Sequence, residues 1–265
     1  MQQTSFNFEV LIHDDASTDG TQEIIKAYQA KYPNIIKPIF QTENQYSQGK
    51  RGFNAKYNYS RAQGKYIALC EGDDYWTDPL KLQKQVDFLE ANPKCILTYH
   101  AWIEKHGEKF QEPKKMFSST HTIMFRNIID KFQDHLNIPV LNGDTLLKFL
   151  LLHYGKECFV EGIEPAVKHR DSGGVWNSLS YQKQEKSKLH TSQLMLKELR
   201  GTKFENRAKT KFVNTLISSN RHLRARNIEH LSANKEISLA LKYGVFFKYS
   251  WSKLAYLKNN LINGN

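Results

Sequence analysis

The sequence predicts an α/β fold in which strands alternate with helices, on the basis of three observations. Apolar runs at residues 8–12, 35–40, 66–70 and 95–100 have the length and composition of buried strands. The stretches between them place apolar side chains at helical spacing, and two of the runs lead directly into acid-rich turns. Alternating strands and helices form a largely parallel sheet with helices on both faces, and ligands bind beyond the carboxyl ends of its strands.

The elements of the first hundred residues follow one another in a regular order. Between and after the four strands we expect three helices, at residues 21–32, at 54–63, and from Thr77 or Asp78 to Asn92-Pro93. Gly64 follows the second helix at a position where a left-handed residue is favoured as a cap. Pro79 occupies the predicted first position of the third helix, where its fixed backbone angle suits the helix start.

The second half of the chain has a less regular pattern. It predicts a strand at 122–125, helices at 128–136 and 145–154, and short strands at 158–160 and 166–168. We expect this half to hold the second substrate. From about Tyr181 onward the chain is helical and basic, so the sequence predicts a first domain at residues 1–180 and a basic helical extension at 181–265.

The charge of the chain indicates an anionic partner. The 265 residues carry a formal net charge of +11 with an isoelectric point near 9.4, which suits nucleotide phosphates, a phospholipid surface or nucleic acid. No recognised nucleic-acid-binding motif or platform of basic and aromatic residues is present, so we do not expect nucleic acid as a partner.

Cysteine usage and hydropathy point to a cytoplasmic protein. The cysteines Cys70, Cys95 and Cys158 stand singly in apolar runs, without the spacing of a disulfide framework or a zinc site, so we interpret them as buried thiols in a reducing compartment. No apolar stretch approaches the roughly 20 residues of a membrane-spanning helix, and the first residues lack the pattern of a signal peptide. We therefore expect a cytoplasmic location, at most peripheral to a membrane.

The two acid-rich turns are the most informative feature for function. Residues 14–21 read DDASTDGT and residues 71–76 read EGDDYW, each directly after a predicted strand. Two like charges about 4 Å apart repel by roughly 1 kcal/mol in water and roughly 4 kcal/mol at an effective dielectric near 20, so these clusters need a cation, hydrogen-bond donors or protonation. A metal-bound nucleotide diphosphate supplies the missing charge. The alternative is that acids such as Asp19 and Asp78 only cap helices.

These turns, with GKYIALC before the second and DPLKLQ after it at residues 78–83, closely resemble family 2 glycosyltransferases of the GT-A fold. The resemblance runs from about Phe8 to Trp176. It implies a Rossmann-like nucleotide-binding half with a mixed sheet, followed here by the helical extension. It also implies an enzyme that moves a sugar, with inversion, from a nucleotide-sugar to a glycan or lipid-linked acceptor in surface polysaccharide assembly. The donor is usually a UDP-sugar, and Mg²⁺ or Mn²⁺ bridges its two phosphates.

By motif matching, the resemblance assigns roles to the acidic residues. Asp15 would contact the uracil, Asp73 the ribose hydroxyls and Asp74 the metal ion, for which hard oxygen ligands are suitable. We count Glu71 among the nucleotide-binding residues as a supporting partner of this metal ligand. Arg51, in a loop that lies near the nucleotide in the family, would pair with diphosphate oxygens, although a solvated basic loop is equally consistent with the sequence.

Asp144 resembles the catalytic base of the family. Asn142-Gly143-Asp144 opens a predicted helix, and this aspartate would take a proton from the acceptor hydroxyl as the hydroxyl attacks the anomeric carbon. The alternative is that Asp144 only caps its helix, worth about 1 kcal/mol of stability.

Residues 169–176 (HRDSGGVW) resemble the family's loop that closes over the diphosphate. The family often carries a histidine two residues before the glycines, and Asp171 stands there in this chain. Either Asp171 replaces the histidine near the metal, or a shift in register brings His169 or Arg170 inward. Gly173 and Gly174 fit a backbone that approaches phosphate, and they fit a plain turn almost as well.

The first residues of this chain resemble a part of the family pattern that follows its usual first strand and helix. Family members usually start with a further strand and helix, so we expect an N-terminally truncated domain with an exposed strand flank, reduced stability and weak or absent nucleotide binding. A catalytically inactive remnant or fragment of the family is the alternative to an active enzyme.

The C-terminal segment suggests contact with a membrane. Apolar and lysine residues alternate at helical spacing over residues 239–261, as in basic amphipathic helices that lie on anionic membranes. An ordinary helix packed on the core, with its lysines in water, is the alternative, because Gly244 interrupts the pattern. The sequence leaves open which sugar is donated and which acceptor receives it.

Overall fold

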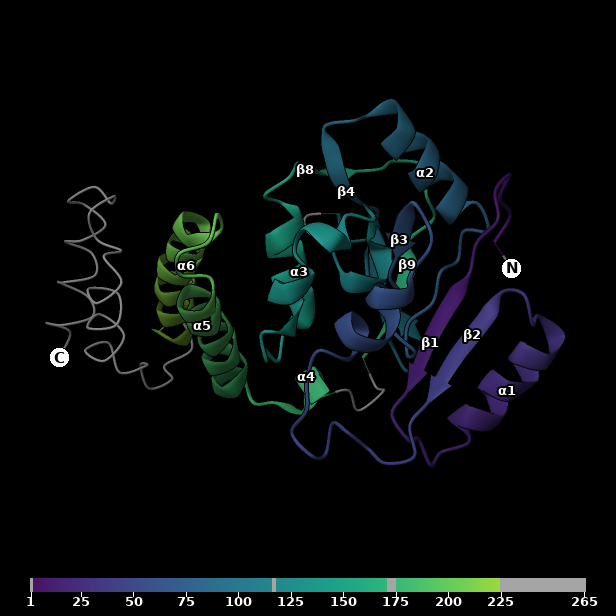
Figure 1. Ribbon diagram of the computed structural model, residues 1–265, viewed down its shortest axis with the longest axis horizontal. Helices are drawn as coiled ribbons and strands as arrows, with labels where there is room; N and C mark the ends of the chain where they lie inside the picture. The colour runs from purple at the N-terminus through teal and green to yellow at the C-terminus, as the bar shows by residue number, and fades with distance from the viewer. Residues whose placement is uncertain (1, 116–117, 171–174, 225–265) are drawn as a thin grey trace, which may run out of the picture. The chain divides into compact units, whose positions relative to one another are not determined.

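The computed structural model of the chain describes residues 2–115, 118–170 and 175–224 (Figure 1). The chain divides into two compact units. Unit 1 comprises Met1–Pro139 with Gly143–Gly174, and unit 2 comprises Val140–Asn142 with Val175–Asn265. The functional boundary expected after residue 180 stays a prediction.

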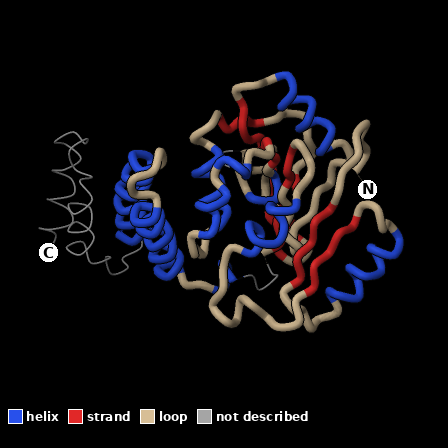
Figure 2. Tube along the Cα trace, in the orientation of Figure 1, coloured by secondary structure: helices blue, strands red, loops and turns tan. Residues whose placement is uncertain are grey.

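The described residues of unit 1 form three small sheets, shown as red segments in Figure 2. The first pairs β1 (Val10–Asp14) with β2 (Ile36–Phe40) in parallel. The second has the order β3-β7-β4-β8, formed by β3 (Tyr66–Ala68), β7 (Met124–Arg126), β4 (Cys95–Tyr99) and β8 (Lys156–Phe159). The third has the order β6-β5-β9, formed by β6 (Lys109–Phe110), β5 (Trp102–His106) and β9 (Ala166–His169).

The sheets are mixed, as the resemblance implied, rather than largely parallel. β7 runs antiparallel to both β3 and β4, whereas β8 is parallel to β4 and β9 is parallel to β5. Among the described residues, β1 pairs only with β2 and β3 pairs only with β7, so each of these two strands keeps one edge that no described strand covers. The expected reduction in stability and in nucleotide binding stays a prediction.

The helices of unit 1 lie between the strands along the chain, and Figure 1 shows α1 beside β2. They are α1 (Thr21–Lys31), a π-helical turn (Asn54–Asn58), α2 (Lys81–Ala91), α3 (Gly143–Leu151) and short 3₁₀ turns at Tyr59–Arg61, Thr120–Thr122, Ile129–Lys131 and Gln133–Asn137. Unit 2 contains α4 (Val175–Ser178), α5 (Tyr181–Glu198) and α6 (Glu205–Arg224).

Two acidic residues hold helix starts, as the capping alternative proposed. The Asp19 carboxylate accepts a hydrogen bond from the Thr21 amide at 3.2 Å. The buried Asp78 carboxylate accepts from the Leu80 amide at 2.7 Å, in the turn before α2, which begins at Lys81 rather than at Pro79.

Two predicted helices are replaced by short turns that are not α-helical. The helix expected at 54–63 is a π turn followed by a 3₁₀ turn that ends at Arg61. Its sequence is rich in Asn, Tyr and Ser, which are modest helix formers, and Arg61 bonds back to the Tyr57 and Ile12 carbonyls. Gly64 is not left-handed, so the predicted cap is wrong. The helix expected at 128–136 is replaced by two 3₁₀ turns.

The prediction of three buried thiols is wrong. Cys95 on β4 and Cys158 on β8 form a disulfide across two neighbouring strands, with 6.0 Å between their Cα atoms, and Cys70 is free and exposed. The two partners are 63 residues apart, so their spacing in the sequence gave no sign of the pairing. The disulfide also removes the cysteine argument for a reducing compartment.

The core of unit 1 lies between α2, α3 and the second sheet. The sheet contributes Leu97 and Phe125, α2 contributes Leu89, and α3 contributes Leu147 and Leu150, all of them almost fully buried. In unit 2, α5 and α6 bury a separate apolar set that consists of Leu189, Met195, Leu196, Phe204, Phe212, Val213 and Leu216.

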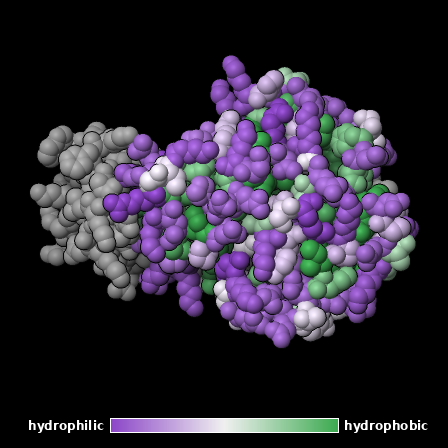
Figure 3. Space-filling view, in the orientation of Figure 1, coloured by the Kyte–Doolittle hydropathy of each residue, from purple (hydrophilic) through white to green (hydrophobic). Residues whose placement is uncertain are grey.

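Hydrophilic side chains cover most of the face of the molecule shown in Figure 3. None of the helices in the described ranges is both long and apolar enough to cross a membrane. The amphipathic pattern at 239–261 lies outside the described residues, so membrane contact stays a prediction.

The side-chain ammonium of Lys81 is buried among apolar and aromatic atoms rather than paired with an acid in the described part of the chain. Its side chain is fully buried, and its Nζ lies 3.8 Å from the centroid of the Trp76 ring and has no hydrogen-bond partner among the described residues. Burial lowers the pKa of the Lys81 ammonium from 10.5 to about 7. The unfolded chain therefore holds a proton that the folded chain lacks between about pH 7 and 10.5, so stability rises with pH across this window.

We expect Lys81→Met to stabilise the protein at pH 6.5 by about 1 to 3 kcal/mol, because methionine fills a similar volume without an unpaired polar group. The gain should shrink as pH rises to 9. Denaturant unfolding at both pH values measures it, with Lys26→Met as the control, since Lys26 lies over the Phe40 ring but is exposed. A less stable Lys81→Met variant at pH 6.5 would contradict this interpretation.

Candidate functional site

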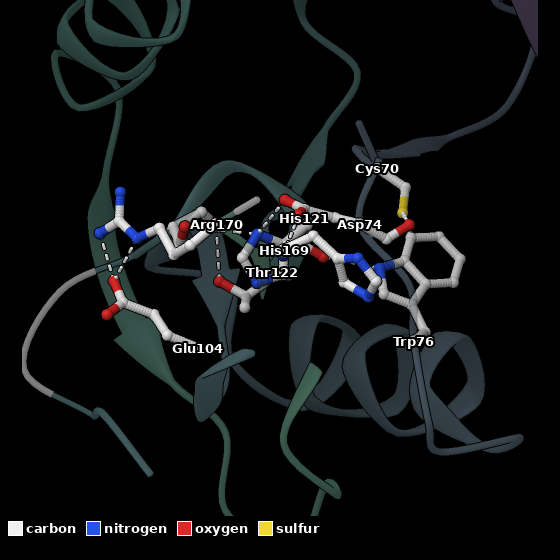
Figure 4. A network of polar contacts seen from close by, with 9 residues as sticks. Cys70, Asp74, Trp76, Glu104, His121, Thr122, His169 and Arg170 are labelled. Atoms are coloured by element: carbon white, nitrogen blue, oxygen red, sulfur yellow. Dashed lines mark hydrogen bonds and ion pairs between the residues drawn. The ribbon is translucent and has the colours of Figure 1, made fainter. Parts of the chain in front are cut away.

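The acidic turn after β3 is fixed to strand β9. Tyr75 and Val167 exchange both backbone hydrogen bonds, at 3.1 and 2.9 Å, in an antiparallel bridge. The His169 amide donates to Asp74 Oδ1 at 3.0 Å. Figure 4 shows Asp74 beside His121 and His169. The turn that carries the predicted metal ligand is therefore anchored to β9, where His169 lies 95 residues after Asp74 in the sequence.

His121 is a side-chain partner of Asp74. Its Nδ1 lies 3.0 Å from Asp74 Oδ2, and both side chains are buried. The 3₁₀ turn before β7 carries His121, and the Trp76 indole N–H donates to the His121 carbonyl at 2.6 Å. Burial acts to raise the pKa of Asp74, but the hydrogen bond and charge of His121 and the His169 amide outweigh it and hold that pKa below its ordinary value.

Glu71 joins these two residues in a group that fits a divalent metal ion. One donor atom each from Glu71, Asp74 and His121 lies within 4.8 Å of the others. His121 Nε2 is buried without a hydrogen-bond partner in the described part of the chain. Carboxylate oxygens suit Mg²⁺ and Mn²⁺, and an imidazole nitrogen is a common ligand of transition metals. The donor set therefore fits the expected cofactor, and His121 would be an additional ligand.

The carboxyl group of Glu71 lies among protein atoms although part of its side chain is exposed. This desolvation, together with the negative charges of Asp74 and Asp144, raises the pKa of Glu71 to about 7, against the opposing effect of the Lys168 charge. A divalent cation at this position would favour the charged form of both carboxylates.

Asp144 lies in the first turn of α3 and is exposed. Among the described residues its carboxylate makes no hydrogen bond, which argues against the capping alternative. Burial raises the pKa of Tyr59, and the charges of Asp144 and Glu71 raise it further. The negative charges of three carboxylates therefore meet in the same region of unit 1, although the residues, Asp144, Glu71 and Asp74, come from distant parts of the sequence.

Asp15 and Arg51 act on one loop. The Asp15 carboxylate accepts hydrogen bonds from the Gln45 and Tyr46 amides at 2.9 and 2.8 Å. The Arg51 guanidinium lies 4.0 Å from the centroid of the Tyr46 ring and donates to the Tyr46 carbonyl. In this structure both side chains hold the loop in place, and their contacts with a nucleotide stay predictions.

The remaining predicted residues are Asp73 and Asp171. Asp73 is exposed in the turn next to Asp74. Asp171 lies outside the described residues, as do Gly173 and Gly174. Of the alternatives named for this loop, Arg170 is held by the buried Glu104, and His169 contacts Asp74 through its backbone amide rather than its ring.

Sequence reasoning missed His121 and Lys168. His121 stands alone in the run SSTHTIMF, where nothing in the spacing distinguishes a metal ligand from a buried histidine. Lys168 was assigned only as the end of a strand. Each is brought to the acidic turn by sheet pairing over a long sequence separation, which local patterns do not reveal.

A family model described as Glycosyl transferase family 2 matches residues 1–147, more than half of the chain. An uncharacterized protein of Mycobacterium tuberculosis is 48% identical over 101 residues, which cover 37% of this chain and 28% of that protein. A putative glycosyltransferase of Bacillus subtilis, EpsE, is 41% identical over 92 residues, which cover 35% of this chain and 31% of that protein.

An Escherichia coli protein named UDP-Glc:alpha-D-GlcNAc-diphosphoundecaprenol beta-1,3-glucosyltransferase WfaP is 33% identical over 105 residues, covering 40% of this chain and 39% of that protein. The matched regions span less than half the length of these curated relatives. Among solved structures, S. aureus TarS 1–349 in complex with UDP-GlcNAc matches with a TM-score of 0.55 and 15% identity, covering 99% of this chain and 85% of that one.

Proposed function

Because this chain belongs to glycosyltransferase family 2, we propose that it transfers a sugar, with inversion, from a nucleotide-sugar to a glycan or lipid-linked acceptor in surface polysaccharide assembly. The chain has the GT-A fold that its sequence motifs implied. The observation that carries the proposal is the grouping of Glu71, Asp74 and His121 beside β9, with the Asp144 charge acting on Glu71.

The donor is a UDP-sugar in this proposal. The structural neighbour holds UDP-GlcNAc, and one relative is named for a UDP-Glc donor, which supports a uridine nucleotide. Asp73 would bind the ribose and Asp15 the uracil. Glu71, Asp74 and His121 would hold Mg²⁺ or Mn²⁺, which when bound neutralises charge on the departing diphosphate.

Asp144 is the base in this mechanism. Its exposed carboxylate takes the proton of the acceptor hydroxyl while the hydroxyl oxygen attacks the anomeric carbon opposite the diphosphate. The bond to the diphosphate oxygen breaks as the new glycosidic bond forms, which inverts the anomeric configuration. Asp74 stays ionised through this step because His121 and the His169 amide stabilise its charge.

UDP release from a panel of UDP-sugars, with Mn²⁺ and with glycan and lipid extracts as acceptors, tests the proposal. We expect acceptor-dependent release together with a product of inverted configuration by NMR. A chain that binds UDP without releasing it from any donor would instead be the inactive remnant. Cytoplasmic location and peripheral membrane contact remain predictions alongside this function.

A further inference from the structure

Lys168 lies directly across from the predicted metal ligand. Tyr75 and Val167 form an isolated hydrogen-bonded antiparallel bridge, and its register, continued by one residue, would place Asp74 opposite Lys168. Residues that face each other in this way project from the same face of the pairing and lie close together. The His169 amide, next to Lys168 in the chain, donates to the Asp74 carboxylate at 3.0 Å, so this carboxylate lies against the backbone of β9.

The charge of Lys168 is not neutralised by a direct partner. Among the residues that the structure describes, its ammonium makes no hydrogen bond and no ion pair within 4.0 Å, and its side chain is half-buried. The neighbouring basic groups are engaged: the buried Glu104 carboxylate binds both Arg170 and Lys114 (Figure 4 shows the Arg170 contact). Lys168 is thus an available cation beside Glu71 and Asp74.

Charge balance indicates what this lysine binds. Without a metal ion, the Lys168 charge partly offsets the two carboxylates. Once a divalent cation binds Glu71 and Asp74, the carboxylates are neutralised and Lys168 faces a second cation, which is unfavourable unless an anion joins them. An ammonium is a compact charge that binds phosphate oxygens well.

We propose that Lys168 binds the diphosphate of the donor, next to the metal ion held by Glu71, Asp74 and His121. This inference rests on the proposed function for the metal ion and for the identity of the donor. Inorganic pyrophosphate presents the same anion without nucleoside or sugar, so it tests Lys168 independently of sugar transfer.

Calorimetric titration of pyrophosphate into the Mn²⁺-loaded chain measures the effect. We expect Lys168→Met to weaken pyrophosphate binding about tenfold or more, as for loss of one charge-assisted hydrogen bond. Lys168→Arg should retain affinity to within about threefold. Lys105→Met is the matched control, because Lys105 lies on the neighbouring strand with its ammonium over the Phe110 ring, and it should bind as the unchanged chain does.

Binding of Mn²⁺ alone, followed by electron paramagnetic resonance, separates this role from a structural one. Removal of a cation opposite Asp74 should leave Mn²⁺ affinity unchanged or make it tighter. Weaker binding of both Mn²⁺ and pyrophosphate in Lys168→Met, equal pyrophosphate affinity in all variants, or no pyrophosphate binding by the unchanged chain would overturn the inference. Lys168-dependent pyrophosphate binding without sugar transfer would refute the proposed function alone.

Discussion

Replacing Asp144 by asparagine should lower sugar transfer by about 10² to 10⁴-fold, the range typical of a lost general base. The amide has the same shape but does not accept the hydroxyl proton at neutral pH. Binding of UDP should change little, because Asp144 is predicted to contact the acceptor and not the nucleotide. Initial rates of UDP release and calorimetric UDP titrations measure the two effects separately.

The control for this variant is Asp130→Asn, an exposed aspartate in the 3₁₀ turn Ile129–Lys131. Asp130→Asn should keep full activity. Stability of Asp144→Asn should stay within about 0.5 kcal/mol of the unchanged chain, as for surface substitutions, because no cap hydrogen bond to a described residue is lost. An Asp144→Asn variant that is less stable but turns over normally would restore the capping explanation.

Asp74→Asn should abolish metal binding together with activity. Asparagine can still accept the His169 amide bond, but it removes the charge that faces Glu71 and His121. We expect Mn²⁺ affinity to fall by more than about 100-fold. Mutation of a residue that only hydrogen-bonds a metal ligand already lowers metal affinity about 10- to 100-fold. Titration of Mn²⁺ followed by electron paramagnetic resonance measures the loss.

The adjacent residue supplies the control. Asp73→Asn should bind Mn²⁺ as the unchanged chain does and weaken only the nucleotide, because Asp73 is predicted to contact the ribose. Equal Mn²⁺ affinity in the unchanged chain and in Asp74→Asn would show that the metal, if any, binds elsewhere.

Local patterns in the sequence predicted most strands of unit 1. The run at 8–12 and the strand β1 differ by two residues at each end, and the strand expected at 95–100 is β4. Both runs are too short for a typical helix and contain β-branched residues. The hairpin of β5 and β6 was missed. Its sequence from Trp102 to Phe110 carries many charged residues and lacks an apolar run.

The candidate site was predictable only in part. Asp74 was identified because its turn has a distinctive local sequence. The contacts that complete the site are long-range: the His169 amide is 95 residues from Asp74, and the Trp76 indole is 45 residues from the His121 carbonyl that it binds. The Cys95–Cys158 disulfide was missed for the same reason, since only the parallel pairing of β4 and β8 brings these residues together.

A crystal structure of the chain with Mn²⁺ and UDP at high concentration tests the central claim most directly. Anomalous scattering should place one manganese ion on Asp74, beside the diphosphate, with Asp73 at the ribose and Asp15 at the uracil. Manganese bound away from Asp74, or Asp15, Asp73 and Asp74 facing separate regions of solvent with no shared ligand, would contradict the account.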